Sequence, residues 1–381
     1  MESKEFREKH WVGCEVEREH LGEERKTSKE NRKRKQAKDR SKYKKTNQQQ
    51  LKKSEASQEK ILSNINHLKG KVIAIHSVGI SVACENDVYL CSLRGSLKKE
   101  KTQFKNLIVV GDDVLFEIIN DNEGAIVSIE SRSSILSRAD NLSRRKEQLI
   151  AANIDQVLIT VSVVIPPLKP FLIDRYIIAA KKGNMTPIIV INKIDLLDKT
   201  SEDPFVLQEI ELYNEFINAY SSTGLTILSL SAERPETLED LRSIMKDKSS
   251  VFSGQSGVGK STLINKITGS TLKIGEPVQR TRKGAHTTTM AQLLPLDFGG
   301  WCVDTPGIKS FGVWDLNKKE IEEYYGEIHE IGINCKFPNC THTHEHACAV
   351  KEALENNSLS PLRYASYISL LETIELEHLR R

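Results

Sequence analysis

Residues 254–261 read Gly254-Gln255-Ser256-Gly257-Val258-Gly259-Lys260-Ser261, and the rest of the chain is best understood from them. They match G-x-x-x-x-G-K-[ST], a loop whose backbone N–H groups surround a phosphate chain. In this pattern Lys260 reaches the β- and γ-phosphates and the Ser261 hydroxyl ligates Mg²⁺. An apolar strand before the loop and a helix after it argue against a glycine-rich turn that matches by chance. We expect these eight residues and Thr262 to bind a nucleoside triphosphate.

A base-recognition element comes earlier in the chain. Asn192-Lys193-Ile194-Asp195 follows a predicted buried strand, at the edge where α/β sheets bind ligands. A carboxylate at Asp195 accepts from guanine N1–H and the exocyclic amino group, whereas adenine would leave it unpaired. The Asn192 amide and the Lys193 stem support the same ring, and Ser231-Ala232 supplies a backbone N–H for guanine O6. The predicted ligands are therefore GTP and GDP.

Two later segments are expected at the γ-phosphate. In Asp304-Thr305-Pro306-Gly307, Asp304 would hold Mg²⁺ through water and the Gly307 N–H would meet the γ-phosphate. His286-Thr287-Thr288-Thr289 offers a second hydroxyl ligand for Mg²⁺, and the sequence leaves open which threonine it is. His286 is a candidate for positioning the attacking water, with a purely structural role as the alternative. Ile308 stands where Ras-like enzymes place glutamine, so we predict slow intrinsic hydrolysis that a partner stimulates.

The order of these elements is unusual. In Ras-like proteins the phosphate loop comes first, whereas here N-K-x-D precedes it. The same sheet forms if the original ends are joined and the chain is reopened elsewhere, because termini usually lie at the surface. Alternating predicted strands and helices support a parallel α/β sheet. We predict a circularly permuted P-loop GTPase domain over 135–316, whose Asp304 segment passes a γ-phosphate-dependent shift to the module that follows.

A cysteine- and histidine-rich segment lies in that last module. Its candidate zinc ligands form a Cys₃His set, which is common in closed structural sites: Cys335, Cys340, His342 and Cys348. His344 and His346 stand beside His342 as alternative ligands, and three unrelated cysteines in a histidine-rich loop are the alternative to a metal site. An acidic helix at about 317–330 and a helix opening at Ser360-Pro361 make 317–381 a mostly α-helical zinc-binding domain.

The N-terminal third contains two different regions. Residues 66–134 hold about five short alternating strands separated by turn signals, which predicts a small β-barrel of the OB-fold type. OB-type barrels often bind oligonucleotides, which suggests an RNA-facing role, but this sequence shows no row of aromatics for base stacking. Residues 1–65 are basic and lack hydrophobic periodicity, so we expect a disordered leader. That leader either contacts nucleic-acid phosphates or is a solvated segment with no task.

Composition agrees with a multidomain cytoplasmic protein. The chain has 381 residues, 38% of them hydrophobic, enough for about two to four domains. No stretch approaches the ~18 apolar residues of a membrane span, and the polar N-terminus does not resemble a secretory signal. Seven cysteines, three of them clustered after residue 330, favour a reduced compartment and one metal site. We expect a monomer with no membrane partner.

In their order, these motifs resemble the circularly permuted GTPases of the small-ribosomal-subunit biogenesis family, called RsgA or YjeQ. The similarity runs from about Lys71 to the C-terminus. It implies the GTP contacts and the zinc ligands named above, with Mg²⁺ bound alongside GTP. It also implies that the barrel and the zinc module hold 16S rRNA, and that GTP hydrolysis releases the protein from the maturing 30S subunit. Ala285 departs from the arginine that relatives commonly carry before His286.

Two rival functions remain at the level of sequence. One is a GTP-controlled RNA-binding module whose turnover is incidental, and single-turnover rates with and without small subunits would distinguish it. The other is a GTPase that uses the Cys/His cluster to pass zinc on, and tight retention of the zinc against a chelator would argue for a structural site instead.

Overall fold

The computed structural model describes residues 67–95, 97, 106–139, 147–198, 200–269, 291–304 and 318–379. Residues Leu68–Arg381 form one compact unit. The predicted basic leader at 1–65 lies outside the described residues, as do 286–289 and 305–307 from the predicted γ-phosphate segments. Within the described ranges, no helix has the length and the apolar character to cross a membrane.

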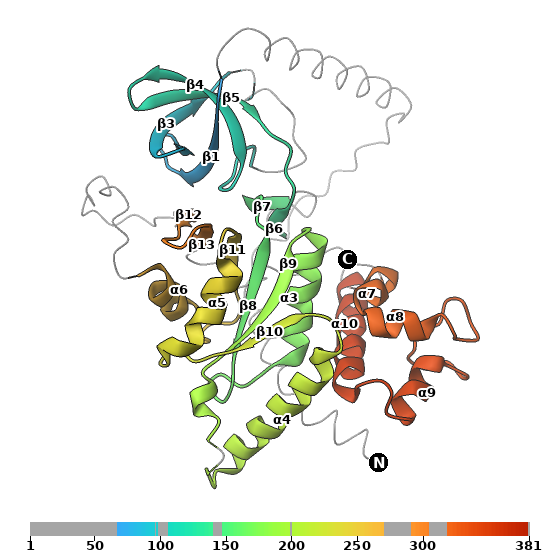
Figure 1. Cartoon of the computed structure of the whole chain (residues 1–381). Helices are drawn as coiled ribbons and strands as arrows, with labels where there is room; N and C mark the ends of the chain where they lie inside the picture. Colours follow the sequence, from blue (N-terminus) through green and yellow to red (C-terminus); the bar gives the residue numbers. More distant parts are fainter. Residues whose placement is uncertain are drawn as a thin grey trace, which may run out of the picture. The chain divides into compact units, whose positions relative to one another are not determined.

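Five strands form a closed barrel, drawn from blue to teal in Figure 1. They are β1 Leu68–Ile75, β2 Ile80–Cys84, β3 Asp87–Leu93, β4 Asp113–Asn120 and β5 Glu123–Ile129. Their order is β1-β2-β3-β5-β4, and β4 pairs back to β1 to close the barrel. Side chains such as Val72, Val82 and Phe116 fill the interior, as the two-residue period of a strand requires. The predicted OB-type barrel is confirmed.

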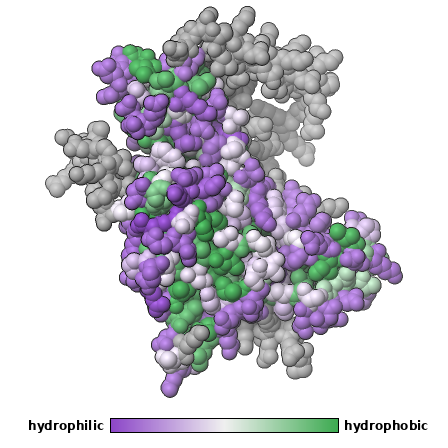
Figure 2. Space-filling model, in the orientation of Figure 1, coloured by the Kyte–Doolittle hydropathy of each residue, from purple (hydrophilic) through white to green (hydrophobic). Residues whose placement is uncertain are grey.

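Few aromatic side chains are available on this barrel, as the sequence indicated. Tyr89 is half-buried, and its ring lies 5.2 Å from that of Phe116 between centroids. The exposed apolar side chains of the barrel include Val88, Ile118 and Ile119. Figure 2 shows hydrophobic surface at the part of the barrel that carries β4, with hydrophilic surface around it. Scattered apolar residues of this kind are common on soluble proteins and do not by themselves mark a binding site.

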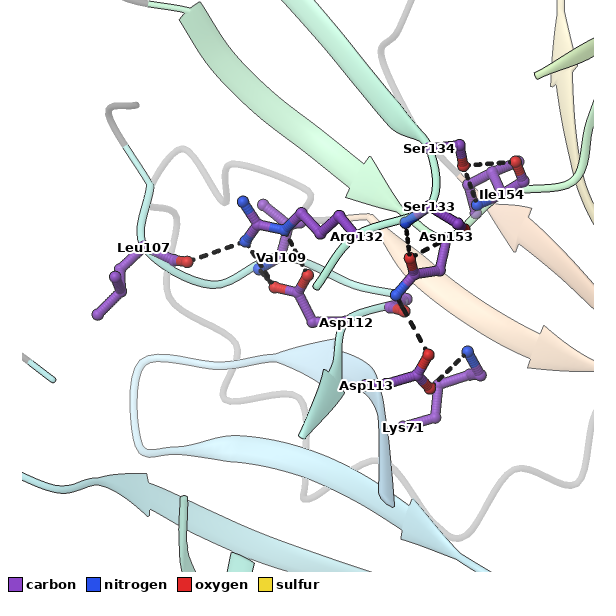
Figure 3. A network of polar contacts seen from close by, with 11 residues as sticks. Lys71, Leu107, Val109, Asp112, Asp113, Arg132, Ser133, Ser134, Asn153 and Ile154 are labelled. Atoms are coloured by element: carbon purple, nitrogen blue, oxygen red, sulfur yellow. Dashed lines mark hydrogen bonds and ion pairs between the residues drawn. The ribbon is translucent and has the colours of Figure 1, made fainter. Parts of the chain in front are cut away.

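A buried ion pair holds the entrance to β4, as Figure 3 shows. Arg132 donates from Nε to Asp112 Oδ1 at 2.6 Å and from Nη2 to Asp112 Oδ2 at 2.9 Å. Asp112 is fully buried and also accepts from the N–H of Val109 at 2.9 Å. Asn153 donates from Nδ2 to the Gly111 carbonyl at 3.0 Å, which ties a second segment to the same loop. These contacts compensate the buried carboxylate for its lost hydration.

A two-stranded hairpin follows the barrel, and six further strands continue the sheet through an antiparallel pairing with β1. The hairpin consists of β6 Ile135–Ala139 and β7 Glu147–Ala152. The sheet strands are β8 Gln156–Ser162, β9 Thr186–Asn192, β10 Thr226–Ser229, β11 Ser249–Ser253, β12 Gln292–Pro295 and β13 Trp301–Asp304. Their order is β10-β9-β8-β11-β13-β12, and all neighbours run parallel except β12 and β13. The strand before the phosphate loop thus lies in the middle of the sheet, beside β8, and the predicted α/β class is confirmed.

Helices cover both faces of this sheet. On one face lie α5 Glu239–Met245 and α6 Lys260–Thr268, which pack through Leu241 and Leu263 on strand residues such as Leu158. Alternate strand residues point to the opposite face, where α3 Pro170–Lys182 lies along β8 and β9 (Figure 1). The fourth helix, α4 Pro204–Ser221, begins at the cap Asp203, whose side chain accepts from the Phe205 N–H at 2.9 Å.

The C-terminal part is helical, as predicted. Its helices are α7 Lys318–Tyr324, α8 Gly326–Gly332, α9 Ala349–Glu355 and α10 Pro361–Leu379. The single acidic helix predicted at about 317–330 is instead two helices, because the backbone of Tyr325 leaves the helical region with φ −100° and ψ 76°. The Tyr325 ring is 1% exposed and meets the Tyr367 ring edge-on, with 5.4 Å between centroids. Burial of this ring favours the break over a continuous helix.

Candidate functional site

The phosphate loop lies between β11 and α6, where the sequence predicted it. Gly254, Gly257 and Gly259 have φ values of 147°, 86° and 94°, a region that L side chains rarely enter. A Cβ at Gly254 would lie 1.9 Å from the Thr160 carbonyl oxygen, and one at Gly259 would lie 2.4 Å from Asn192 Nδ2. Residues of β8 and β9 therefore lie so close to the phosphate loop that both positions require glycine.

Lys260 opens α6 and folds back over its own loop. Its Nζ donates to the carbonyl oxygens of Gly254 and Gln255, each at 2.7 Å. Burial lowers the pKa of Lys260 below its usual value, because desolvation disfavours the ammonium. Phosphate oxygens are stronger acceptors than neutral carbonyls, so this lysine is placed to turn toward a bound triphosphate. Ser256, Ser261 and Thr262 are exposed, which leaves their hydroxyl groups accessible.

The structure brings the predicted base element into contact with the phosphate loop. Asn192, the last residue of β9, donates from Nδ2 to the Val258 carbonyl at 2.9 Å. Lys193 donates from Nζ to the Gly257 carbonyl at 2.7 Å. The two motifs are far apart in sequence, yet both lie at the carboxyl ends of parallel strands, where open α/β sheets bind ligands. The two motifs are therefore in direct contact at this edge of the sheet.

Asp195 and Ser231 are also adjacent. Asp195 lies in η2 Ile194–Leu196, a short 3₁₀ turn, and its Oδ1 accepts a hydrogen bond from the Ser231 hydroxyl. The contact orients the carboxylate that the sequence assigned to guanine. The N–H of Ala232, which the sequence assigned to guanine O6, donates to Asn192 Oδ1 at 3.1 Å in this arrangement. Asn192 thus joins the phosphate loop and the Ser231-Ala232 turn through the two ends of one amide.

One residue that the sequence did not single out strengthens this site. Lys266 on α6 donates from Nζ to the Ala232 carbonyl, and its Nζ lies 3.7 Å from Glu233 Oε2. The helix that follows the phosphate loop is therefore tied to the turn expected at the base. A surface lysine on a helix carries no sequence signal for this contact, because lysines usually only solvate an exposed face.

The predicted γ-phosphate elements are only partly described. The backbone of Asp304 ends β13, paired with Gln292 of β12, next to the central strands. His286, Thr287, Thr288, Thr289 and Gly307 lie outside the described residues, so their roles stay predictions.

The Cys/His cluster is assembled as the sequence predicted. The ligand atoms of Cys335, Cys340, His342 and Cys348 all lie within 4.8 Å of one another. His342 Nδ1 lies 3.5 Å from Cys335 Sγ and 3.4 Å from Cys348 Sγ, and those two sulfurs are 3.8 Å apart. Tetrahedral zinc with Zn–S of about 2.3 Å and Zn–N of about 2.0 Å requires spacings of about 3.5–3.8 Å between ligand atoms. The donor set and its geometry fit a zinc ion.

The histidine ring has a definite orientation. Because Nδ1 of His342 faces the thiols, its Nε2 points away from them, and it lies 3.7 Å from Glu322 Oε1 on α7. The side chain is 1% exposed, and among the described residues Nε2 has no hydrogen-bond partner. Metal-bound histidines usually donate their second N–H to a carboxylate or carbonyl, and Glu322 is in that position. The alternative ligands His344 and His346 are exposed and outside the cluster.

Comparison with known proteins gives the family. Sequence profiles described as RsgA GTPase and RsgA N-terminal domain match residues 129–314 and 69–126. Small ribosomal subunit biogenesis GTPase RsgA 2 of Bacteroides thetaiotaomicron is 36% identical over 313 residues, which cover 81% of this chain and 97% of that protein. The chain belongs to the RsgA family of GTPases. A second RsgA, from Chlorobaculum parvum, is 39% identical over 279 residues, covering 71% of this chain and 86% of its own length.

Solved structures of RsgA-type proteins agree with this assignment. YjeQ from Thermotoga maritima superposes with a TM-score of 0.64 at 31% identity, covering 81% of this chain and 98% of that one. YloQ, described as a circularly permuted GTPase, gives a TM-score of 0.64 at 27% identity, with 83% and 97% covered. As an RsgA-family member the chain is a GTP hydrolase with a circularly permuted GTPase fold.

Proposed function

We propose that this RsgA-family GTPase is a late assembly factor of the 30S ribosomal subunit and uses GTP hydrolysis to leave it. The observation that carries the proposal is the pair of hydrogen bonds from Asn192 and Lys193 to the Val258 and Gly257 carbonyls. They join the base-type element to the phosphate loop, as a nucleotide shared by the two would require. The name of the relatives, small ribosomal subunit biogenesis GTPase, supports the choice of partner.

In this proposal the nucleotide is held from both ends. The guanine pairs with Asp195, which Ser231 orients, and the phosphates lie along residues 254–261 with Lys260 turned toward them. Mg²⁺ bound by Ser261, by one threonine of 287–289 and by Asp304 through water supplies the charge neutralisation that phosphoryl transfer needs. Hydrolysis is slow until a partner orders the 286–289 segment, because Ile308 offers no group to hold water.

The remaining parts serve RNA binding. We infer that residues 66–134 and 317–381 hold 16S rRNA on either side of the 135–316 switch, and that the basic leader adds contacts to phosphates. Zinc in the Cys₃His site is structural, because all four positions are filled by protein and leave none for water. The protein acts as a cytoplasmic monomer. A closed site of this kind disfavours the zinc-transfer function among the alternatives.

Nucleotide-dependent sedimentation with 30S subunits tests the proposal. The full chain should pellet with 30S subunits in the presence of a non-hydrolysable GTP analogue and stay in the supernatant with GDP. Equal binding in both states would refute a GTP-controlled release. Single-turnover hydrolysis with and without 30S subunits separates this function from an RNA-binding module with incidental turnover, since the latter would show no stimulation.

A further inference from the structure

A buried glutamate supports the loop next to the nucleotide site. Glu209 on α4 is 5% exposed, although charged residues on helices usually face water. Its Oε2 accepts from the N–H of Val164 and from the N–H of Leu168, each at 3.1 Å. One carboxylate oxygen therefore holds both ends of the segment that follows β8, which we call the 163–168 loop.

This loop has a conformation that its sequence does not favour. Val164 has φ 68°, a left-handed value that is strained for a β-branched residue. Such a conformation persists only where the surroundings fix it, and the contacts of Glu209 provide that constraint. The Ser162 hydroxyl adds a third contact, donating to the Pro166 carbonyl at 2.8 Å.

The outer side of the same loop meets the nucleotide-binding elements. Lys193 donates from Nζ to the Ile165 carbonyl at 2.6 Å as well as to the Gly257 carbonyl at 2.7 Å. A Cβ at Gly257 would lie 3.7 Å from Pro166 Cδ, so the two loops are separated by no more than the space of one methyl group at this point. Lys193 thus spans two carbonyls, one on each loop.

We infer that Glu209 is a positioning residue for guanine-nucleotide binding, acting through the 163–168 loop on Lys193. The inference rests on the proposed function, since it assumes that the cleft takes GTP and GDP. Glu209 fixes the loop, the loop presents the Ile165 carbonyl, and this carbonyl with that of Gly257 sets the position of the Lys193 side chain. Glu209 itself does not touch nucleotide.

A double-mutant cycle on the full chain tests this assignment, with fluorescent GDP and GTP analogues as probes. Glu209→Ala should raise Kd for both nucleotides by roughly tenfold, because the loop loses the acceptor that fixes two buried N–H groups. Glu209→Gln keeps an acceptor oxygen in the same place and should stay within about twofold of the parent. Glu211→Ala, an exposed change on the same helix, is the matched control.

The cycle separates a specific role from general destabilisation. In a Lys193→Ala background, Glu209→Ala should add less than about twofold to Kd, because the group through which it acts is already gone. Independent, multiplying effects would overturn the inference, as would a folded Glu209→Ala variant with parental Kd values. If Glu209→Ala does not fold, Glu209→Asp replaces it, since the shortened side chain retracts the acceptor and should weaken binding in the same way. A parent chain that binds neither nucleotide would instead refute the proposed function itself.

Discussion

Arg363 on α10 donates from Nη1 to the carboxylate of Asp174 on α3, and both side chains are almost completely buried. The guanidinium also donates from Nε to Glu327 Oε1 at 2.5 Å, and it stacks on the ring of Tyr220, with 4.7 Å to the centroid. Burial alone would lower the pKa of Arg363, but the neighbouring Asp174 carboxylate keeps it well above its usual value. A fixed charge pair therefore links the GTPase sheet to the C-terminal helices.

Breaking this pair should be strongly destabilising. Arg363→Met removes the ion-pair partner of the buried Asp174 carboxylate. The Tyr220 hydroxyl, which donates to Asp174 Oδ2 at 2.8 Å, would still be in place. We expect a loss of about 3–5 kcal/mol in the free energy of unfolding, measured by urea denaturation. The double change Asp174→Asn with Arg363→Met should recover part of it, because the fully buried charge of Asp174 is removed, whereas Glu327, which also loses Arg363, is partly exposed to water. Glu372→Ala, exposed on the same helix, is the control, and an equally small effect for Arg363→Met would contradict the prediction.

Base preference should depend on Asp195. Asp195→Asn replaces one of the two oxygens that accept from guanine N1–H and its exocyclic amino group with an NH2 donor, so GTP affinity should fall by about a hundredfold or more while xanthosine triphosphate gains relative to GTP. Ser231→Ala, which removes the hydroxyl that donates to Asp195, should weaken GTP by about tenfold without changing the preferred base. Competition binding with the two nucleotides measures both effects. An Asp195→Asn protein with unchanged preference would exclude this carboxylate from base recognition.

Zinc retention should depend on Glu322. The purified protein should hold one zinc per chain, and Glu322→Ala should release it to a chelating dye about 10–100 times faster, because the outer N–H of His342 then faces no carboxylate. Glu323→Ala, the exposed neighbour, should release zinc at the parental rate. Equal rates for the two variants would show that Glu322 does not orient the histidine.

His286 should act in turnover and not in binding. His286→Ala should leave the GTP affinity unchanged and abolish the stimulation of hydrolysis by 30S subunits. The reason is that the sequence predicts His286 near the γ-phosphate, where the attacking water lies, and predicts no contact between His286 and the base. Single-turnover assays measure the effect. A stimulated rate equal to that of the parent eliminates His286 from the mechanism.

Stability should fall at alkaline pH through Cys91. This barrel thiol is 1% exposed, and burial raises its pKa to about 11, whereas an unfolded thiol titrates near 8.5–9. Between these values the thiol ionises in the unfolded chain but stays protonated in the folded protein. The free energy of unfolding therefore falls by up to about 1.4 kcal/mol per pH unit as the pH rises. Unfolding midpoints from pH 8 to pH 11 should therefore fall less steeply in Cys91→Ala than in the parent. Parallel slopes would argue against the shifted thiol.

Local patterns in the sequence predicted most of the fold and the nucleotide motifs. Strands such as β1, β2, β8 and β9 show the apolar pattern of their class, and Gly254, Gly257 and Gly259 mark a backbone that needs positive φ. The hairpin β6/β7 and the strand β12 were missed, because short segments with polar residues acquire strand structure only from their partners.

Tertiary contacts account for what the sequence left open. Glu209 and Arg363 look like surface charges of helices, and only the fold reveals that they are buried against Val164 and Asp174. The break between α7 and α8 likewise depends on the packing of Tyr325. These roles depend on contacts with residues that are distant in the sequence, so the local hydrophobic pattern cannot predict them.

The position of β11 beside β8 has a consequence for how the protein is made. Ser250 is opposite Gln156 in the central pair, so the middle of the sheet cannot close until translation has passed the phosphate loop. During synthesis the base element emerges first, on a sheet of β10, β9 and β8 in which β8 still lacks its β11 partner. A nascent chain therefore becomes able to capture nucleotide only late in elongation, and stalled shorter chains should expose that edge to chaperones.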